Sequence, residues 1–302
     1  MRALVTGGAG FIGSHLVRRL LRDGHEVVVL DDLTSGRRAN IDGLPITFVH
    51  ASVEDRGALR GALGGVTAVF HLAAMVSVPL SLSRPATCLH TNVVGTAAVL
   101  EEARSAGVEA VVFASSAAVY GELQQPVQLE EAVTHPTTPY GVSKRAGEQL
   151  CEVFDAPGCR AISLRLFNVY GPRQDPSSAH AMVVPALVAR AWRGEDLPVF
   201  GDGEQTRDFI HVDDAVDAMV FAAETPSLRG VVNVGTGREV AINALAKLVI
   251  ELCGSGSKIV HEPVRAGDVR RSVASVERLG EAGWSASIDL RAGLLRTIDA
   301  YR

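Results

Sequence analysis

Tyr140 and Lys144 lie four residues apart, directly after a proline-rich loop that contains Pro136 and Pro139. On a helix, this spacing places the phenol and the ammonium on one face. A nearby positive charge stabilises a phenolate, so we expect the pKa of Tyr140 to be lowered from about 10 and the phenol to act as a general base. The same spacing is common in helices where the two side chains only pack and meet solvent, so the pair needs independent support.

Ser115 and Ser116 give that support, because they follow an apolar run, Ala110–Ala114, that we expect to be a buried strand. Ligands of α/β folds bind at the carboxyl ends of parallel strands. A serine at such an end can equally well only cap the backbone. The presence of both motifs favours a catalytic site at this edge.

A glycine-rich turn, with Gly7, Gly10 and Gly13, separates the first apolar run from an amphipathic stretch. Glycines there let the backbone approach a pyrophosphate, which meets the N–H groups and positive dipole end of the following helix. Asp31 ends the second apolar run, where a carboxylate accepts hydrogen bonds from ribose hydroxyls and repels a 2′-phosphate. The pattern therefore predicts NAD rather than NADP, although a structural βα turn would also use glycine.

Short apolar runs alternate with longer amphipathic stretches through the first half of the chain. The expected strands are Ala3–Thr6, Glu26–Leu30, Ile46–His50, Ala68–Leu72, Ala110–Ala114 and Ala161–Leu166. The expected helices are Phe11–Asp23, Asp55–Leu63, Ala86–Ala106 and Tyr140–Asp155. Strands that are apolar on both faces predict an α/β fold with a doubly wound parallel sheet.

The alternation stops after Leu166, which predicts a division into two domains. We expect residues 1–166 to form a dinucleotide-binding Rossmann domain that residues 209–240 rejoin. We expect residues 167–208 and 241–302 to form a smaller mixed α/β lobe for the substrate.

Composition excludes several classes of function. The 34 acidic and 29 basic residues give a net charge of −5 with no basic run, so we expect no nucleic-acid partner. No apolar stretch approaches the ~18 residues of a membrane span. Four widely spaced cysteines, no histidine ligand spacing and no signal-peptide pattern lead us to expect a cytoplasmic protein without a metal site.

Taken together, these motifs resemble the extended short-chain dehydrogenases/reductases, the family of NAD-dependent sugar epimerases and dehydratases. Within that family the chain is most similar to UDP-glucose or UDP-N-acetylglucosamine 4-epimerases, from the glycine turn to Asp268. The resemblance implies tightly bound NAD that is recycled in each turnover. It assigns the cofactor to Gly7, Gly10, Phe11, Ile12, Gly13, Asp31, Asp32, Ser35, Gly36, Val53, Leu72, Ala73, Ala74, Tyr140 and Lys144, with the ribose at Asp31 and the adenine at Val53.

The resemblance also implies the roles of the remaining site residues. Ser116 shares a proton with Tyr140 and the sugar O4, and Lys144 also holds the nicotinamide ribose. Asn168, Arg207 and Arg265 contact the diphosphate of a UDP-sugar. Phe200 or Val199 lies against the uracil, and Asp268 binds the uridine ribose. Ser272 sets the pocket width near the sugar C2, where a small residue leaves room for an N-acetyl group.

The residues after Ser116 discriminate between reactions of this family. Dehydratases carry Asp-Glu there, decarboxylating relatives a glutamate, and 3,5-epimerising or fucose-forming relatives a cysteine in this turn. Here the residues are Ala117 and Ala118, which leaves 4-epimerisation, unless an acid such as Glu122 serves instead. A dehydratase or 4-ketoreductase remains the alternative, and a non-catalytic dinucleotide-binding protein is disfavoured by the complete Ser, Tyr and Lys set.

The resemblance further implies a homodimer. Members of the family pair through the helices that match Ala86–Ala106 and Tyr140–Asp155. The apolar stripe that pairing needs is also what packing against a sheet needs, so the sequence does not separate the two.

Overall fold

In the computed structural model, which describes residues 1–122, 125, 127–176, 182–264 and 269–301, the chain forms two units. Unit 1 comprises Met1–Val119, Pro136–Leu166 and Val216–Val232. Unit 2 comprises Tyr120–His135, Phe167–Ala215 and Asn233–Arg302. The chain therefore passes between the units several times.

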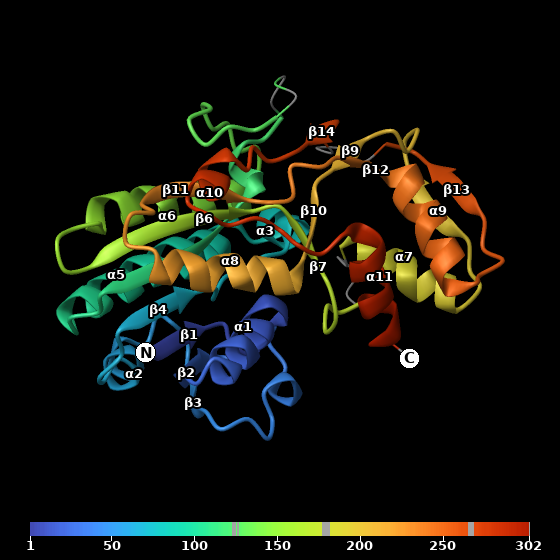
Figure 1. The fold of residues 1–302 in the computed structure, drawn as a ribbon. Helices are drawn as coiled ribbons and strands as arrows, with labels where there is room; N and C mark the ends of the chain where they lie inside the picture. Colours follow the sequence, from blue (N-terminus) through green and yellow to red (C-terminus); the bar gives the residue numbers. More distant parts are fainter. Residues whose placement is uncertain (123–124, 126, 177–181, 265–268, 302) are drawn as a thin grey trace. The chain divides into compact units, whose positions relative to one another are not determined.

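A seven-stranded sheet forms the centre of unit 1, in the order β11-β6-β5-β4-β1-β2-β3 (Figure 1). Its strands are β1 (Arg2–Thr6), β2 (Glu26–Asp31), β3 (Thr47–His50), β4 (Ala68–His71), β5 (Ala110–Ser116), β6 (Arg160–Leu166) and β11 (Gly230–Val234). β1 pairs in parallel with β2 and β4, β2 with β3, and β5 with β4 and β6. This order confirms the predicted doubly wound α/β fold, and it reverses between β1 and β4, where such sheets bind ligands.

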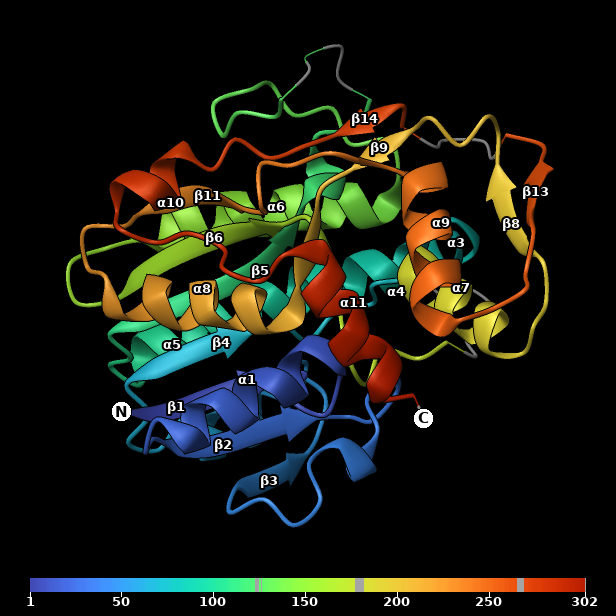
Figure 2. The same ribbon diagram turned by 45° about the vertical axis from the view of Figure 1, so that its right-hand side comes forward.

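Helices cover both faces of this sheet (Figure 2). On one face α2 (Arg56–Ala62), α5 (Gly95–Ser105) and α6 (Pro139–Phe154) share an apolar core with the strands. On the other face lie α1 (Phe11–Arg22) and α8 (Val212–Glu224), joined by the ion pair of Arg19 with Asp217. No helix among the described residues combines the length and apolar character needed to cross a membrane.

The expected helix Ala86–Ala106 is not regular. It consists of α4 (Pro85–Leu89), a π-helical turn at His90–Val94, and α5. The side chain of Asn92 explains the turn: its Oδ1 accepts the N–H of Met75 at 2.7 Å and its Nδ2 donates to Ser143 Oγ at 2.9 Å. These two bonds hold the helix to a loop and to α6, and π turns are frequent at such functional positions.

One short helix was not predicted. α3 (Val78–Ser83) begins at Ser77, whose hydroxyl accepts the N–H of Leu80, and Pro79 lies in its first turn. Both are common helix-starting signals, but an amphipathic period is hard to detect over six residues.

The described residues of unit 2 form small sheets and helices. β7 (Asn168–Tyr170) pairs with β10 (Phe209–His211), and β8 (Leu197–Phe200) with β13 (Ile259–Glu262). β12 (Val240–Ala241), β9 (Thr206–Arg207) and β14 (Arg271–Ser272) form a three-stranded sheet. α7 (Val183–Trp192), α9 (Ile242–Cys253) and α11 (Leu290–Asp299) close an apolar core, and α10 (Glu277–Glu281) follows β14.

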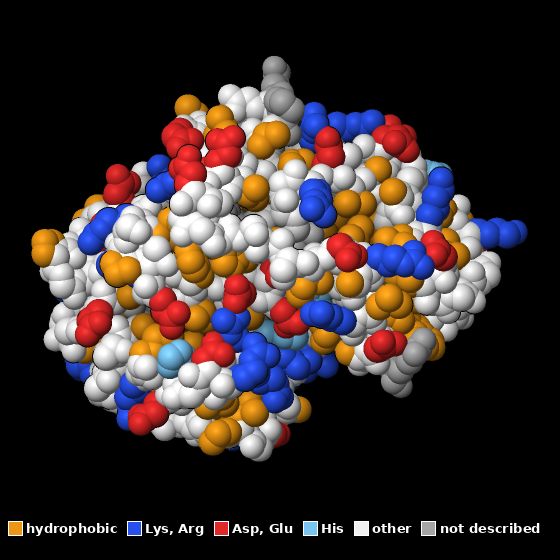
Figure 3. Space-filling view, viewed as in Figure 1, with side chains coloured by type: hydrophobic (Ala, Val, Ile, Leu, Met, Phe, Trp, Pro, Cys, Tyr) orange, Lys and Arg blue, Asp and Glu red, His pale blue; other side chains and the backbone are white. Residues whose placement is uncertain are grey.

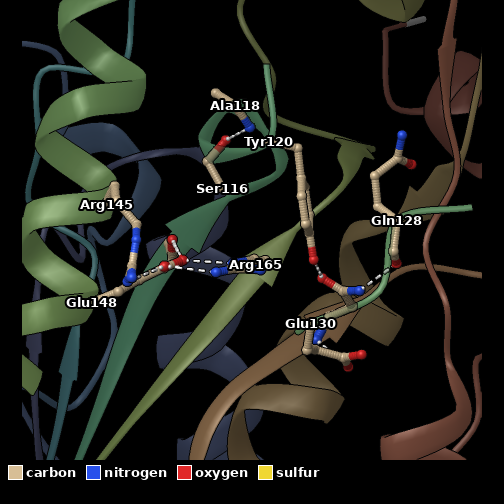
Figure 4. Close-up of polar contacts among 10 residues, drawn as sticks. Ser116, Ala118, Tyr120, Gln128, Glu130, Arg145, Glu148 and Arg165 are labelled. Carbon is tan, nitrogen blue, oxygen red and sulfur yellow. Dashed lines mark hydrogen bonds and ion pairs between the residues drawn. The ribbon is translucent and has the colours of Figure 1, made fainter. Parts of the chain in front are cut away.

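The units differ from the expected domains at residues 120–135, 209–215 and 233–240, which belong to unit 2. Tyr120 Oη donates to Asn233 Oδ1 at 2.7 Å, and Asn233 Nδ2 donates to the carbonyl of Gln128 at 2.9 Å (Figure 4). The Oε1 of Gln128 accepts the N–H of Val273 at 2.6 Å. Residues 120–135 and 233–240 are therefore joined to the rest of unit 2 by long-range hydrogen bonds, which no local sequence pattern reveals.

The surface of the described residues mixes charges of both signs. Figure 3 shows acidic side chains close to many of the basic ones on the face that it draws. Exposed ion pairs such as Arg38 with Asp42 and Arg291 with Glu251 are examples. Such pairs stabilise a fold by little, because both partners stay hydrated.

Candidate functional site

The glycine turn follows β1 and opens α1, as predicted. Gly7 has a φ of +71°, and a Cβ on Gly13 would lie 2.2 Å from the carbonyl oxygen of Gly7. The first N–H groups of α1 have no carbonyl one turn earlier to bind. The turn is thus a cradle, lined by backbone donors and without side chains at Gly7, Gly10 and Gly13, that fits a diphosphate.

The predicted ribose-binding residues gather beside this turn. Asp31 ends β2, is 6% exposed, and accepts the N–H of Ala9 at 2.9 Å and of Leu33 at 2.8 Å. Burial raises the pKa of Asp31, against the opposing effect of these two donors. A carboxylate can accept about four hydrogen bonds, so capacity for ribose hydroxyls remains. Asp32 and Ser35 are exposed and Gly36 is half-buried in the same loop.

The other predicted cofactor residues differ in whether they lie at the glycine turn. Leu72, Ala73 and Ala74 follow β4, and a Cβ on Gly7 would lie 2.8 Å from the backbone nitrogen of Ala73. These residues therefore line the cradle. Val53 is 3% exposed and packs in the core against Gly95, so its assignment to the adenine stays a prediction.

The three predicted catalytic residues come together in unit 1. Ser116 ends β5, and its hydroxyl lies close enough to that of Tyr140, in the first turn of α6, to lower the pKa of Tyr140. Thr138 caps this helix by accepting the N–H of Gly141 at 3.1 Å. Lys144 is 3% exposed, and its Nζ lies 5.9 Å from the centre of the Tyr140 ring.

The expected lowering of the Tyr140 pKa is wrong for the chain by itself. Burial raises the pKa of Tyr140, and the nearby hydroxyl of Ser116 offsets only part of that rise. The ammonium of Lys144 donates to the carbonyl of Ala114 at 2.7 Å, and burial lowers its own pKa to about 8. The spacing in sequence could reveal the shared face but not the desolvation.

The side chains of Ser115 and Ser116 point to opposite faces of the sheet, because side chains alternate along a strand. Its hydroxyl donates to Glu148 Oε1 at 2.6 Å, on the side of the strand that faces α6 and β6. Arg165 donates to the same carboxylate from Nε at 2.8 Å and from Nη2 at 2.9 Å, and Arg145 adds a bond at 3.3 Å (Figure 4). This buried cluster joins β5, β6 and α6.

Sequence reasoning missed that cluster. Glu148 lies four residues after Lys144 on α6 and is 1% exposed, while Arg165 is 2% exposed. A glutamate on one helix and an arginine within an apolar strand are the only signals in the sequence. Neither predicts that they would pair.

A second missed group is His71, at the end of β4. Thr6 Oγ1 and Thr96 Oγ1 lie 2.7 and 2.9 Å from its two ring nitrogens. Thr96 donates to the carbonyl of Asn92 at 2.5 Å, so it accepts the Nε2–H of His71. Burial lowers the pKa of His71 to about 3, which keeps the ring neutral.

Three of the predicted substrate residues meet in unit 2. Arg207 in β9 and Ser272 in β14 are directly paired in parallel register. Asn168, the first residue of β7, donates from Nδ2 to the carbonyl of Asp208 at 3.0 Å. Arg207 and Asn168 are therefore connected through the residue that follows Arg207.

The two candidates for the uracil contact differ in exposure, and both stay predictions. Val199 is 1% exposed because alternate residues of β8 face the core of unit 2. Phe200, the next residue, is half-buried. Arg265 and Asp268 lie outside the described residues.

Comparison with known proteins agrees with this geometry. Residues 3–235 match the NAD dependent epimerase/dehydratase family. A UDP-glucose 4-epimerase of Mycolicibacterium smegmatis is 40% identical over 100% of this chain and 99% of its own length. The crystal structure of the Thermotoga maritima UDP-glucose 4-epimerase with UDP-glucose is 39% identical, covers 100% of this chain and 98% of its own, and superposes with a TM-score of 0.95.

A relative named for a different activity is also similar. The UDP-N-acetyl-alpha-D-glucosaminuronate decarboxylase of Bacillus cytotoxicus is 35% identical over 87% of this chain and 83% of its own length. Overall similarity thus establishes a family, while the reaction has to be argued from the residues of the site.

Proposed function

Because the chain belongs to the NAD-dependent epimerase/dehydratase family, we propose that it interconverts a UDP-sugar and its C4 epimer, either UDP-glucose and UDP-galactose or their N-acetyl forms. NAD is the cofactor. The observation that carries the proposal is that Ser116 and Tyr140 lie next to each other beside buried Lys144, whose Nζ is 5.9 Å from the centre of the Tyr140 ring. These groups can move a proton to and from a sugar hydroxyl, and 4-epimerisation requires no further acid or base.

Each catalytic side chain has a defined role in this proposal. Tyr140 takes the proton of the sugar O4, Ser116 shares that proton, and Lys144 adds a positive charge and binds the nicotinamide ribose. When bound, NAD would supply the acceptor and donor for the C4 hydride and, in its oxidised form, a further positive charge. The 4-keto sugar rotates within the pocket and presents its opposite face. Tyr140 then returns the proton to O4.

Unit 2 binds the nucleotide in this proposal. Arg207 and Asn168 bind the diphosphate, with Arg265 as a further donor, and a guanidinium fork matches diphosphate oxygens well. Phe200 lies against the uracil and Asp268 binds the uridine ribose. Ser272, adjacent to Arg207, leaves room for an N-acetyl group.

Decarboxylation of a UDP-uronic acid is the second candidate, favoured by the Bacillus cytotoxicus relative. Against it, Ala117 and Ala118 stand where decarboxylating relatives place a glutamate and dehydratases an Asp-Glu pair. The candidates differ in carbon count, so the product distinguishes them.

We further propose a homodimer formed through α4, α5 and α6. Leu89, at the end of α4, and Val94, at the end of the π turn, are 37% and 50% exposed. Val142 and Val153 of α6 are 44% and 78% exposed. Light scattering should give twice the chain mass, and Val153→Glu with Val142→Glu should give one chain mass.

The test of the proposed reaction uses the purified full chain, without added cofactor, in D2O. NMR should show UDP-glucose or UDP-N-acetylglucosamine converted to its C4 epimer, with protium retained at C4 because the hydrogen returns from the cofactor. Carbon dioxide release from UDP-glucuronic acid, or a stable 4-keto product, would contradict the proposal. Turnover of the plain sugar alone would contradict the role of Ser272.

A further inference from the structure

Asp208 occupies the single position between β9 and β10, where the chain leaves one small sheet of unit 2 and enters another. β9 belongs to the sheet with β12 and β14, whereas β10 pairs with β7. The side chain of Asp208 is fully buried. A charged residue in such a place needs a set of donors, because burying an unpaired carboxylate is strongly unfavourable.

The backbone of Asp208 forms hydrogen bonds with two of the predicted substrate residues. Its N–H donates to the carbonyl of Ser272 at 2.9 Å. Its carbonyl accepts the backbone N–H of Asn168 at 3.1 Å and the side-chain Nδ2 of Asn168 at 3.0 Å. The third, Arg207, is the preceding residue, so all three are attached to Asp208.

The carboxylate of Asp208 anchors two further segments. Oδ1 accepts the N–H of Thr236 at 2.9 Å and its hydroxyl at 2.6 Å. Oδ2 accepts the N–H of Gly237 at 2.9 Å and of Ala274 at 3.2 Å. A Cβ on Gly235 would lie 2.6 Å from Oδ2, so this loop approaches the carboxylate as closely as a residue without a side chain permits.

We propose that Asp208 is the positioning residue of the nucleotide site: its carboxylate holds the Thr236–Gly237 loop and the segment after β14 to the end of β9. Its backbone joins β14 and β7 there, so that Arg207, Ser272 and Asn168 form one binding array. The inference rests on the proposed UDP-sugar function. Asp208 does not touch the nucleotide itself. Two-residue strands have few ladder hydrogen bonds of their own, and the carboxylate supplies the missing constraint.

The chemistry of the four donors explains why an aspartate is needed. A carboxylate only accepts, and each oxygen here accepts two bonds. An asparagine would place an NH₂ group against the N–H donors and leave at least one of them unsatisfied. Burial raises the pKa of Asp208, and its donors act against that rise.

Asp214, in the same unit, offers a matched control. It is 5% exposed, and it accepts the hydroxyl and N–H of Ser287 at 3.0 and 3.2 Å and the N–H of Ile288 at 2.9 Å. None of these partners is a predicted substrate residue. Asp214→Asn therefore imposes a similar loss of buried acceptors without a link to the nucleotide site.

The experiment measures UDP affinity by calorimetry, bound NAD, melting temperature and steady-state kinetics for wild type, Asp208→Asn and Asp214→Asn. Both variants should lose a similar amount of stability. Asp208→Asn should weaken UDP binding at least tenfold and raise KM with kcat and bound NAD little changed, whereas Asp214→Asn should bind UDP like wild type. Equal UDP affinity in the two variants would overturn the role of Asp208.

Thr236→Val removes only one hydroxyl donor and serves if Asp208→Asn does not fold. It should weaken UDP binding by a few-fold, and an unchanged affinity would contradict the proposal. Failure of wild type to bind UDP would overturn the proposed UDP-sugar substrate together with this inference. Binding by wild type with no effect of either variant would overturn only the inference.

Discussion

Two buried carboxylates, Glu148 in unit 1 and Asp208 in unit 2, are held by different kinds of donor. Glu148 accepts two hydrogen bonds from the guanidinium of Arg165 and one from Ser115. Among the described residues, the carboxylate of Asp208 accepts hydrogen bonds only from backbone N–H groups and from the hydroxyl of Thr236. The charge of Glu148 is balanced by a guanidinium, whereas the charge of Asp208 is balanced by N–H and O–H dipoles.

The difference follows from the elements that each carboxylate joins. β5, β6 and α6 are seven, seven and sixteen residues long, so ladder and helical hydrogen bonds already fix them, and the charge pair sets how they meet. β9 and β14 have two residues each and depend on the loops around Asp208. Damage in unit 1 should therefore affect the chemistry, and damage in unit 2 the binding of the nucleotide.

Tyr140→Phe gives the largest expected effect and separates the two units most directly. Without the phenolic hydroxyl, kcat should fall by about 10²–10⁴-fold, the usual range for a positioned acid or base. UDP affinity and bound NAD should be unchanged. Tyr120→Phe is the matched control, because it removes a buried hydroxyl bonded to Asn233 in unit 2. Wild-type turnover by Tyr140→Phe, measured by NMR, would remove the proposed base.

Glu148→Gln tests whether the charge pair positions the catalytic residues. It leaves the guanidinium of Arg165, whose side chain is 3% exposed, without its opposite charge, and breaking a buried pair costs about 3–5 kcal/mol. We expect that loss in urea unfolding, with a lower kcat and an unchanged UDP affinity.

The control for this variant is Glu102→Gln. Glu102 is buried, but its partners Arg56 and Arg60 are 46% and 65% exposed and stay hydrated when the charge is removed. Its unfolding free energy should fall by less than that of Glu148→Gln. Equal losses in the two variants, with kcat unaffected in both, would show that Glu148 has no positioning role.

The sequence predicts unit 1 well because its signals are local. Six strands, α1 and α6 were expected within one or two residues of their observed bounds, and the glycine turn and the Tyr140–Lys144 pair each lie within one short segment. The π turn at Asn92 was not predicted, because it depends on bonds to Met75 and Ser143. Burial raises the pKa of Tyr140 in the chain without a cofactor, and burial has no local signal in the sequence.

Unit 2 was predicted less well for the same reason. Two-residue strands such as β9 and β14 have no detectable period, so the pairing of Arg207 with Ser272 had no signal. Val199 and Phe200 alternate along one strand, and the sequence does not say which of them faces the core. Asp208 follows Arg207 as an ordinary acidic residue, and only the folded chain shows its four donors.

The pH dependence of catalysis tests Lys144. Its pKa of about 8 means that the ammonium loses its proton as the pH rises above that value, so kcat/KM should fall there. The pKa of Tyr140 is raised above its usual value, so Tyr140 in the chain by itself cannot produce that loss. The guanidinium introduced by Lys144→Arg keeps its charge at high pH. This variant should have a lower kcat/KM that no longer falls at alkaline pH. An unchanged decline in Lys144→Arg would assign it to another group.

The smallest expected effect concerns His71 in unit 1, which resembles Asp208 because both have neutral hydrogen-bond partners. Its pKa is about 3 in the folded chain and about 6.5 when unfolded, so between these values only the unfolded chain binds the proton. Stability is therefore lost as the pH falls below about 6.5, by about 1.4 kcal/mol per unit for one group. The side chain introduced by His71→Gln does not titrate. Urea unfolding should show a lower free energy of unfolding for this variant than for wild type at pH 7, and this difference should shrink as the pH is lowered toward 5. A deficit that stays constant over this range would mean that His71 is not held neutral by its burial.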